Sequence, residues 1–246
     1  TSLLNNTTGS QNTCVGANSG YANTTANNTN AFGYGALVNN TTGADNCAFG
    51  TAALGANTTA TRNNAFGIST LASNTVGQYN AAFGYNALRK NTTADNNSAF
   101  GYYALACNTT GHSNTGIGQG ALQATTDGDQ NTAVGNSALT TATTAGSNTA
   151  VGHDALKATT TGGQNNAFGD GTMSANTTGC RNVAMGNGAM IKNTEGICNT
   201  AIGHIALQCN TTGDNNTAVG ACALKTNTGS VNTAVGVNAL SLNTSG

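Results

Sequence analysis

Residues 39–59 read NNTTGADNCAFGTAALGANTT and contain one turn phrase, Asn-Thr-Thr, twice at an interval of 17 residues. A glycine keeps the same interval through the chain. It stands at positions 16, 33, 50, 67, 84, 101, 118, 135, 152, 169, 186, 203 and 220. The last copy, Gly236, follows Gly220 at an interval one residue shorter than the others. A fixed period of this length is the signature of a repeat architecture in which each unit stacks on its neighbours.

The repeat sorts residue types by position. With the periodic glycine numbered as position 5, the consensus is N-T-A-(V/F)-G-x-x-A-L-x-x-N-T-T-G-x-x. Position 4 is apolar in every copy and holds every phenylalanine of the chain, and position 9 is Leu or Met in all complete copies but the first. Because a disordered chain would not sort its residues in this way, the pattern indicates a solenoid. The short copy reads Asn227-Thr228-Gly229, a loss of one threonine of the kind that a loop tolerates.

Seventeen residues are too few for the helix pairs of α-solenoids, whose repeats take about 33–47 residues. Gly, Asn and Thr at fixed places favour turns over helix interiors. We therefore predict one all-β domain over residues 1–246, a parallel β-solenoid of about 14 coils with short T-A-V/F-G and A-L-x strands. Position 4 and position 9 are expected to form the core ladder, which consists of Phe32, Phe49, Phe66, Phe83, Phe100, Phe168, Leu37, Leu54, Leu71, Leu88 and Leu105.

Position 3 is Ala in twelve copies, with Cys14 and Gly116 as the exceptions. If position 4 points inward, strand alternation turns position 3 outward. Alanine is a poor strand former, so its recurrence on an outer face predicts a close contact with another surface. That surface is either a neighbouring roll, which we favour, or a tight fold of the same coil.

The composition excludes several classes of partner. Only 6% of the residues are charged and the net charge is −1, without basic or acidic blocks. The chain therefore lacks the cluster of basic residues that would bind nucleic acid or an anionic membrane. No apolar run approaches the length of a membrane span, so we expect no membrane insertion.

The phrase Asn131-Thr132-Ala133-Val134-Gly135, followed by Ala138-Leu139, resembles the head β-roll repeats of trimeric autotransporter adhesins. It is also similar to repeats of tail-fibre-like and bacterial surface proteins. The resemblance extends over the whole chain and implies a left-handed parallel β-roll, secretion, and an adhesive or fibrous role. The 17-residue coil is longer than that of the adhesin heads, and the coiled-coil stalk and membrane anchor of that family are missing from this sequence.

The Asn-Thr-Thr turns have two interpretations. In an exposed turn of a secreted protein, N-x-S/T is an acceptor for glycans. Asn and Thr also simply make good turns and side-chain ladders between coils. The glycosylation candidates are Asn6, Asn23, Asn40, Asn57, Asn91, Asn108, Asn176, Asn210 and Asn243.

Reactive side chains are sparse and scattered. Cys180 and Cys198 stand one coil apart and are the candidates for a disulfide, while the other cysteines are expected to be free thiols. His112, His153 and His204 are too far apart along the repeat to share a metal ion. Since no catalytic constellation is placed by the repeat, we expect no enzyme activity, no metal site and no cofactor.

Two hypotheses for function follow, both extracellular or at the cell surface. The first is a structural subunit or segment of a fibre, in which copies associate end to end into a filament and carry covalent glycans on the turns. The second is an adhesin or phage-type tail-fibre head that binds a surface receptor as a homotrimer. An ice-binding solenoid is a remote third possibility, because the threonines do not form a flat T-x-T strand.

Overall fold

The computed structural model describes residues 1–245 and is an all-β solenoid. It divides into two compact units, Thr1–Asp127 and Gly128–Gly246, which are described separately. The first unit contains β1 (Thr13–Val15), β2 (Asn30–Phe32), β3 (Cys47–Phe49), β4 (Asn64–Phe66), β5 (Ala81–Phe83), β6 (Ser98–Phe100) and β7 (Thr115–Ile117). The second contains β8 (Thr132–Val134), β9 (Thr149–Val151), β10 (Asn166–Phe168), β11 (Val183–Met185), β12 (Thr200–Ile202), β13 (Thr217–Val219) and β14 (Thr233–Val235).

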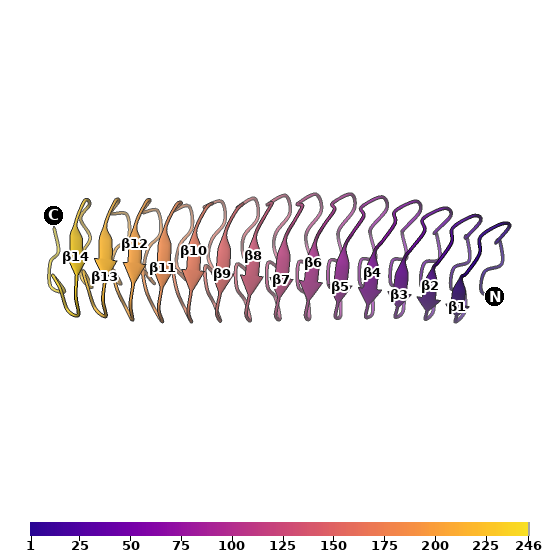
Figure 1. Cartoon of the computed structure of the whole chain (residues 1–246), viewed down its shortest axis with the longest axis horizontal. Helices are drawn as coiled ribbons and strands as arrows, with labels where there is room; N and C mark the ends of the chain where they lie inside the picture. The colour runs from indigo at the N-terminus through magenta and orange to yellow at the C-terminus, as the bar shows by residue number, and fades with distance from the viewer. Residues whose placement is uncertain (246) are drawn as a thin grey trace. The chain divides into compact units, whose positions relative to one another are not determined.

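Within each unit the strands pair in parallel and in chain order, each one with the strand of the next coil (Figure 1). The register is the repeat itself: Phe49 lies opposite Phe66, and Phe66 lies opposite Phe83. Each strand therefore covers repeat positions 2 to 4, and the remaining residues of the coil form turns. The predicted parallel β-solenoid with 17-residue coils is confirmed, whereas the second predicted strand, A-L-x, is a turn in the structure.

The core is thin and consists of small and medium-sized side chains. Position 3 alanines such as Ala65 and position 8 alanines such as Ala87 are completely buried, and so are the position 9 side chains from Leu54 to Leu224, whereas Leu240 of the last coil is 55% exposed. The prediction that the leucines are interior is confirmed for Leu37, Leu54, Leu71, Leu88 and Leu105.

The prediction that the phenylalanines line the core is wrong. Phe32, Phe49, Phe66 and Phe83 are half-buried, and Phe100 and Phe168 are 38% exposed. Strand alternation holds, but in the opposite sense: position 3 points inward and positions 2 and 4 point outward. The interior holds Leu and two alanines side by side, so a phenylalanine ring at position 3 would not fit in it. The alanine column is consequently not an outer contact strip.

Two ladders of buried asparagine side chains form hydrogen bonds with the backbone groups of the turns. At position 1, the Asn63 amide nitrogen Nδ2 donates to the Gly77 carbonyl at 2.9 Å, and Asn63 Oδ1 accepts from the Asn80 N–H at 3.0 Å. At position 12, Asn57 Nδ2 donates to Asn40 Oδ1 at 2.7 Å and to the Ala60 carbonyl at 3.1 Å. These hydrogen bonds between buried amides hold neighbouring coils in register, although Asn108 Oδ1 and Asn210 Oδ1 have no hydrogen-bond partner among the described residues.

The periodic glycine is required by the distance between coils. Gly84 has φ +136°, and a Cβ atom there would lie 2.7 Å from the Gly101 carbonyl carbon of the next coil. No L side chain fits this approach, which explains why position 5 is glycine in every copy.

Candidate interaction surface

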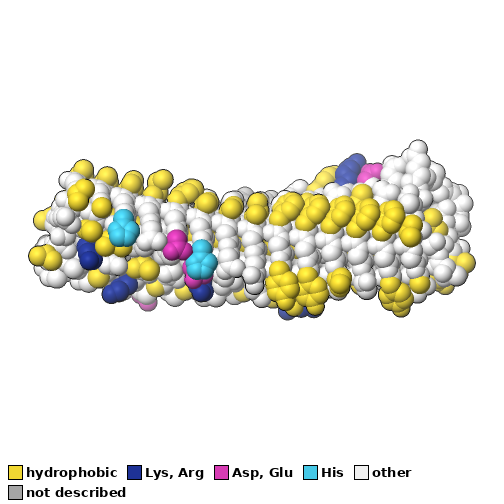
Figure 2. Space-filling view, turned by 90° about the horizontal axis from the view of Figure 1, so that it is seen from below, with side chains coloured by type: hydrophobic (Ala, Val, Ile, Leu, Met, Phe, Trp, Pro, Cys, Tyr) yellow, Lys and Arg dark blue, Asp and Glu magenta, His cyan; other side chains and the backbone are white. Residues whose placement is uncertain are grey.

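The outer face of the sheet carries a continuous row of apolar side chains in each unit. In the first unit we call this row the apolar stripe, and it consists of Val15, Phe32, Phe49, Phe66, Phe83, Phe100 and Ile117. Figure 2 shows it as a row of yellow side chains along one face. The corresponding row of the second unit is Val134, Val151, Phe168, Met185, Ile202, Val219 and Val235.

The phenylalanines of the stripe stack on one another in register. The ring centroids of Phe32 and Phe49 are 4.5 Å apart with an interplanar angle of 9°, and those of Phe83 and Phe100 are 4.8 Å apart at 7°. This spacing is the separation of hydrogen-bonded strands. Since each ring is pinned between its two neighbours, the stripe is a preordered apolar surface.

The residues beside the stripe are neutral. Position 2 of β1 to β7 is Thr, Asn, Cys, Ala or Ser, and position 2 of β8 to β14 is Thr, Asn or Val. Within the described strands this face therefore carries no charged side chain, and no strand charge would oppose its contact with a second apolar surface.

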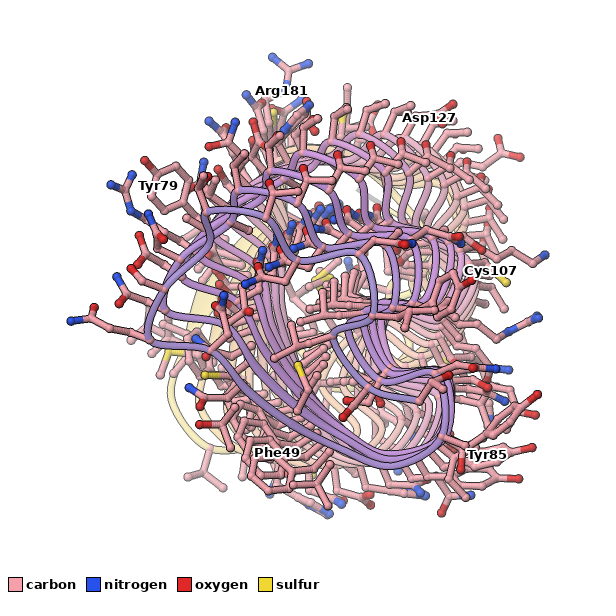
Figure 3. The ribbon with its side chains drawn as sticks, turned by 90° about the vertical axis from the view of Figure 1, so that its right-hand side faces the viewer. Phe49, Tyr79, Tyr85, Cys107, Asp127 and Arg181 are labelled. Carbon is pink, nitrogen blue, oxygen red and sulfur yellow. The ribbon has the colours of Figure 1, made fainter. Side chains whose placement is uncertain are left out.

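A second aromatic group lies on the side of the coil next to the stripe. Tyr102 and Tyr103 meet edge to face with ring centroids 4.5 Å apart, and Tyr85 stacks on Tyr102 at 5.4 Å. Partial desolvation, with the two neighbouring phenols as further causes, raises the pKa of Tyr102 above its ordinary value. Figure 3 shows Phe49 and Tyr85 pointing out of the coil on adjacent sides, with Tyr79 on another side. The sequence pattern did not single out these tyrosines, although position 6 is aromatic in several copies of the first unit.

The turn asparagines do not form a row of exposed acceptors. Asn23, Asn40, Asn57, Asn91, Asn108, Asn176 and Asn210 are at most 1% exposed, which contradicts their interpretation as surface glycosylation sites. The amide nitrogen that would carry a glycan is already used: Asn91 Nδ2 donates to Asn74 Oδ1 at 2.8 Å. Only Asn6, which is exposed, and Asn243, which is half-buried, remain accessible among the candidates.

The cysteines are free thiols among the described residues, including the predicted pair Cys180 and Cys198. These two residues are instead joined through their main chains, because the Cys198 N–H donates to the Cys180 carbonyl at 3.1 Å. Burial raises the pKa of the Cys14 thiol, which occupies an inward-facing position 3.

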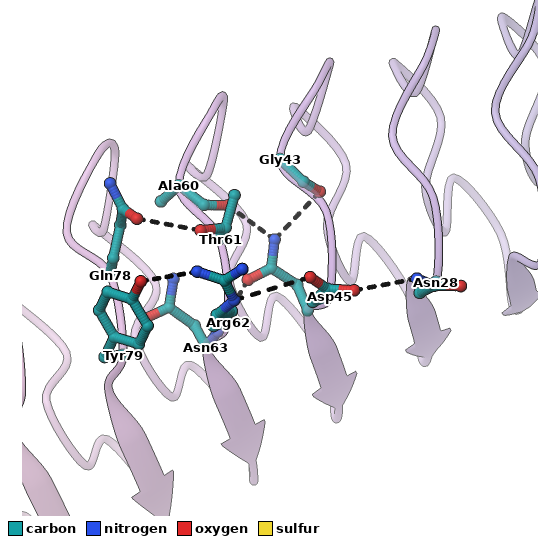
Figure 4. A network of polar contacts seen from close by, with 10 residues as sticks. Asn28, Gly43, Asp45, Ala60, Thr61, Arg62, Asn63, Gln78 and Tyr79 are labelled. Atoms are coloured by element: carbon teal, nitrogen blue, oxygen red, sulfur yellow. Dashed lines mark hydrogen bonds and ion pairs between the residues drawn. The ribbon is translucent and has the colours of Figure 1, made fainter.

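The charged side chains form short exposed rows between coils. Asn28, Asp45, Arg62 and Tyr79 occupy position 17 of successive coils (Figure 4). Asn28 Nδ2 donates to Asp45 Oδ1 at 3.0 Å, and the Arg62 guanidinium donates to the Tyr79 hydroxyl at 2.6 Å. The Arg62–Asp45 ion pair is solvent-exposed, so it contributes little to stability.

The histidines lie where the repeat predicts them, at exposed positions of separate coils. His153 Nδ1 is 2.8 Å from Asp170 Oδ1, one coil away. In residues 1–245, no three His, Cys, Asp or Glu side chains are grouped so that they could hold a metal ion. The described residues likewise include no helix of sufficient length and apolarity to span a membrane.

Comparison with protein families, with curated proteins and with solved structures finds no match to this chain.

Proposed function

We propose that this chain is a structural repeat segment, without enzyme activity, that associates laterally with further copies of itself through the apolar stripe. The observation that carries the proposal is the uninterrupted row of seven apolar side chains on the outer sheet face of the first unit. A contiguous exposed apolar surface of this kind marks an interaction site in soluble proteins.

A second copy is the partner that fits best. Its stripe has the same spacing, set by the same strand separation, so side chains of two stripes can interlock along their whole length. Two copies related by a twofold axis would use the same patch on both sides. The net charge of −1 leaves little electrostatic repulsion between copies.

A twofold pair of this kind is closed, so a fibre, which is the function that we favour over a receptor-binding head, also needs the end-to-end contact. The extracellular location is part of the same proposal and is supported by the resemblance of the repeats to bacterial surface proteins. The end-to-end contact and the trimer expected from the sequence stay predictions. A glycan coat has lost most of its support, because seven of its nine candidate asparagines are buried.

Sedimentation velocity and light scattering over a wide concentration range test the proposal. We expect masses that are multiples of the 24.2 kDa chain. The double variant Phe49→Thr/Phe83→Thr should shift the distribution toward the single chain, since it interrupts the stripe but keeps good strand formers.

The matched control is Tyr79→Ser, which removes an exposed aromatic ring from another side of the first unit and introduces the residue that the repeat carries at Ser113 and Ser147. It should leave the mass distribution unchanged. A wild-type chain that stays at 24.2 kDa at every concentration, or a double variant that assembles as well as the wild type, would overturn the proposal.

A further inference from the structure

A hollow of about 380 Å³ opens on the surface of the first unit, next to the apolar stripe, where Tyr34 and Thr51 stand two residues after Phe32 and Phe49. It is lined by Tyr34, Val38, Asn18, Asn39, Gly35 and Gly55. Thr51 and Ala52 complete it. This volume is at the lower end of the range of about 300–1,000 Å³ that is typical of small-molecule sites.

The hollow exists because two repeat positions lack side chains there. Position 7 is Gly35 in this coil but Tyr103 in a later one, and position 10 is Gly55 but Arg89 in a later one. A Cβ atom at Gly35 would meet no heavy atom within 4 Å, so the space above this glycine is open. The repeat does not require glycine at either position, and the hollow is a departure from the consensus.

One wall is a tyrosine ring that is free to contact a ligand. Tyr34 is 62% exposed, and no ring stacking on it is found among the described residues, in contrast to Tyr85, Tyr102 and Tyr103, which pack on one another. An aromatic face carries partial negative charge and attracts polarised C–H groups laid flat against it.

The polar groups around the hollow are neutral amides and a hydroxyl. Asn39 is held in place because its Nδ2 atom donates to the Gly55 carbonyl of the next coil at 2.8 Å, and its Oδ1 atom is the group that can accept a hydrogen bond from a ligand. Asn18 and Thr51 supply a further amide and a hydroxyl. None of the lining residues is charged, so the site offers neither a counter-ion for phosphate or carboxylate nor a carboxylate to balance the charge of a metal cation.

We propose that this hollow binds one neutral pyranose residue of a glycan. A pyranose presents a face of C–H groups to the Tyr34 ring and a rim of hydroxyls that both donate and accept hydrogen bonds, which matches the amides of Asn18 and Asn39. The inference is independent of the self-association proposed above, because it uses none of the residues of the stripe.

The test is saturation-transfer NMR and titration of the full chain with methyl glycosides of glucose, galactose and mannose. Methyl glucuronide and phenol serve as comparison ligands. We expect millimolar binding of at least one neutral glycoside, in keeping with a single small site. Tyr34→Ala should weaken it about tenfold or more, equivalent to about 1.4 kcal/mol. Gly55→Val, which copies the residue at position 10 of the preceding coil, should fill the hollow and weaken binding equally.

Two control variants test whether binding depends on the ring of Tyr34. Tyr34→Phe retains the ring and Tyr79→Ala removes an exposed tyrosine elsewhere, and both should bind as the wild type does. Melting curves must show that every variant is folded. The proposal fails if no neutral glycoside binds, if Tyr34→Ala binds as well as the wild type, or if phenol or the glucuronide is preferred.

Discussion

Each coil places residues in the left-handed region of φ at positions 7, 9 and 17, and one of them is a core leucine. Leu71 has φ +51° and is completely buried, and the same conformation recurs at Leu88 and Leu105. A β-branched side chain is strongly disfavoured at positive φ. Two such residues, the half-buried Ile205 and the exposed Val231, do occur in this region outside the core, whereas the buried position 9 is never Val or Ile in the complete copies, a restriction that hydrophobicity alone would not impose.

The asparagine ladders give the sharpest prediction at this scale. In Asn63→Asp an oxygen replaces the amide nitrogen that donates to the Gly77 carbonyl, so two acceptors would face each other in a buried site. We expect a loss of several kcal/mol of stability at neutral pH, measured by chemical denaturation.

The loss should depend on pH. Burial without a cation raises the folded-state pKa of the new carboxyl above its unfolded value, so the neutral acid is the form that the fold tolerates. The destabilisation is then smallest below the unfolded pKa and grows as the pH rises through it. Asn64→Asp, on the exposed neighbouring side chain, is the control and should cost little. Equal losses in the two variants would show that the ladder does not hold the coils.

At the scale of the coil, the period, the turns and the leucine column could be predicted from the sequence, but the direction of the strand could not. Alternation assigns positions 3 and 4 to opposite faces, and hydrophobicity favours placing Phe66 inside over Ala65. The structure does the reverse because a coil of 17 residues encloses room for only one leucine, two alanines and the two amide ladders. The constancy of alanine at position 3 was the available signal, since a size limit that strict belongs to an interior.

The candidate surfaces were harder to predict for the same reason. Once the phenylalanines are assigned to the core, no apolar stripe remains to be found on the outside. The hollow beside Tyr34 depends on Gly35 and Gly55 facing the same space from adjacent coils, which only the register of positions 7 and 10 reveals. The turn asparagines look like exposed acceptors until their hydrogen bonds to neighbouring coils are seen.

The short repeat shows that the turn can lose one residue without disturbing the strands. In the ordinary turn, Asn210 Nδ2 donates to the carbonyl of Gly213, three residues on, at 2.9 Å. Where one threonine is missing, Asn227 Nδ2 donates to the carbonyl of Gly229, two residues on, at 3.0 Å. β13 still pairs with β14 in register. The effect of the missing threonine is therefore confined to the turn, as predicted from the sequence.

Paired lysine substitutions test which face of the strand is interior. Phe66→Lys should cost about 1–3 kcal/mol, the sum of two lost ring stacks, because the ammonium group can reach water along the outer face. Leu71→Lys should cost more than about 4 kcal/mol or prevent folding, because its position is completely buried. Thermal and urea unfolding measure the loss of stability in each variant. A Phe66→Lys chain that fails to fold would place position 4 back in the core.

At the scale of the whole molecule, each unit is a stack in which most coils contact their neighbours through the same ladders, although Thr125, Ala142 and Thr159 replace the asparagine of position 12. The free energy of unfolding of such a protein is close to a sum of two contributions, the intrinsic stability of each coil and the contact energy between each pair of neighbouring coils. Removing one complete repeat should therefore leave the remaining contacts in place, whereas removing part of a repeat should not.

Deletion of residues 64–80 tests this directly, because it joins Asn63 to Ala81 and keeps every later residue in its repeat position. Phe49 would then stack on Phe83, Leu54 would pack on Leu88, and Asn91 Nδ2 would donate to Asn57 in place of Asn74. We expect a folded chain with the wild-type circular dichroism per residue and a melting temperature lowered by only a few degrees. The control deletes residues 64–71, which removes Phe66, Gly67 and Leu71 and brings Ala72 into the strand at position 2. That chain should lose cooperative unfolding and expose its first unit to hydrogen exchange. If the two deletions are equally damaging, the coils are not interchangeable and the nearest-neighbour description of this solenoid is wrong.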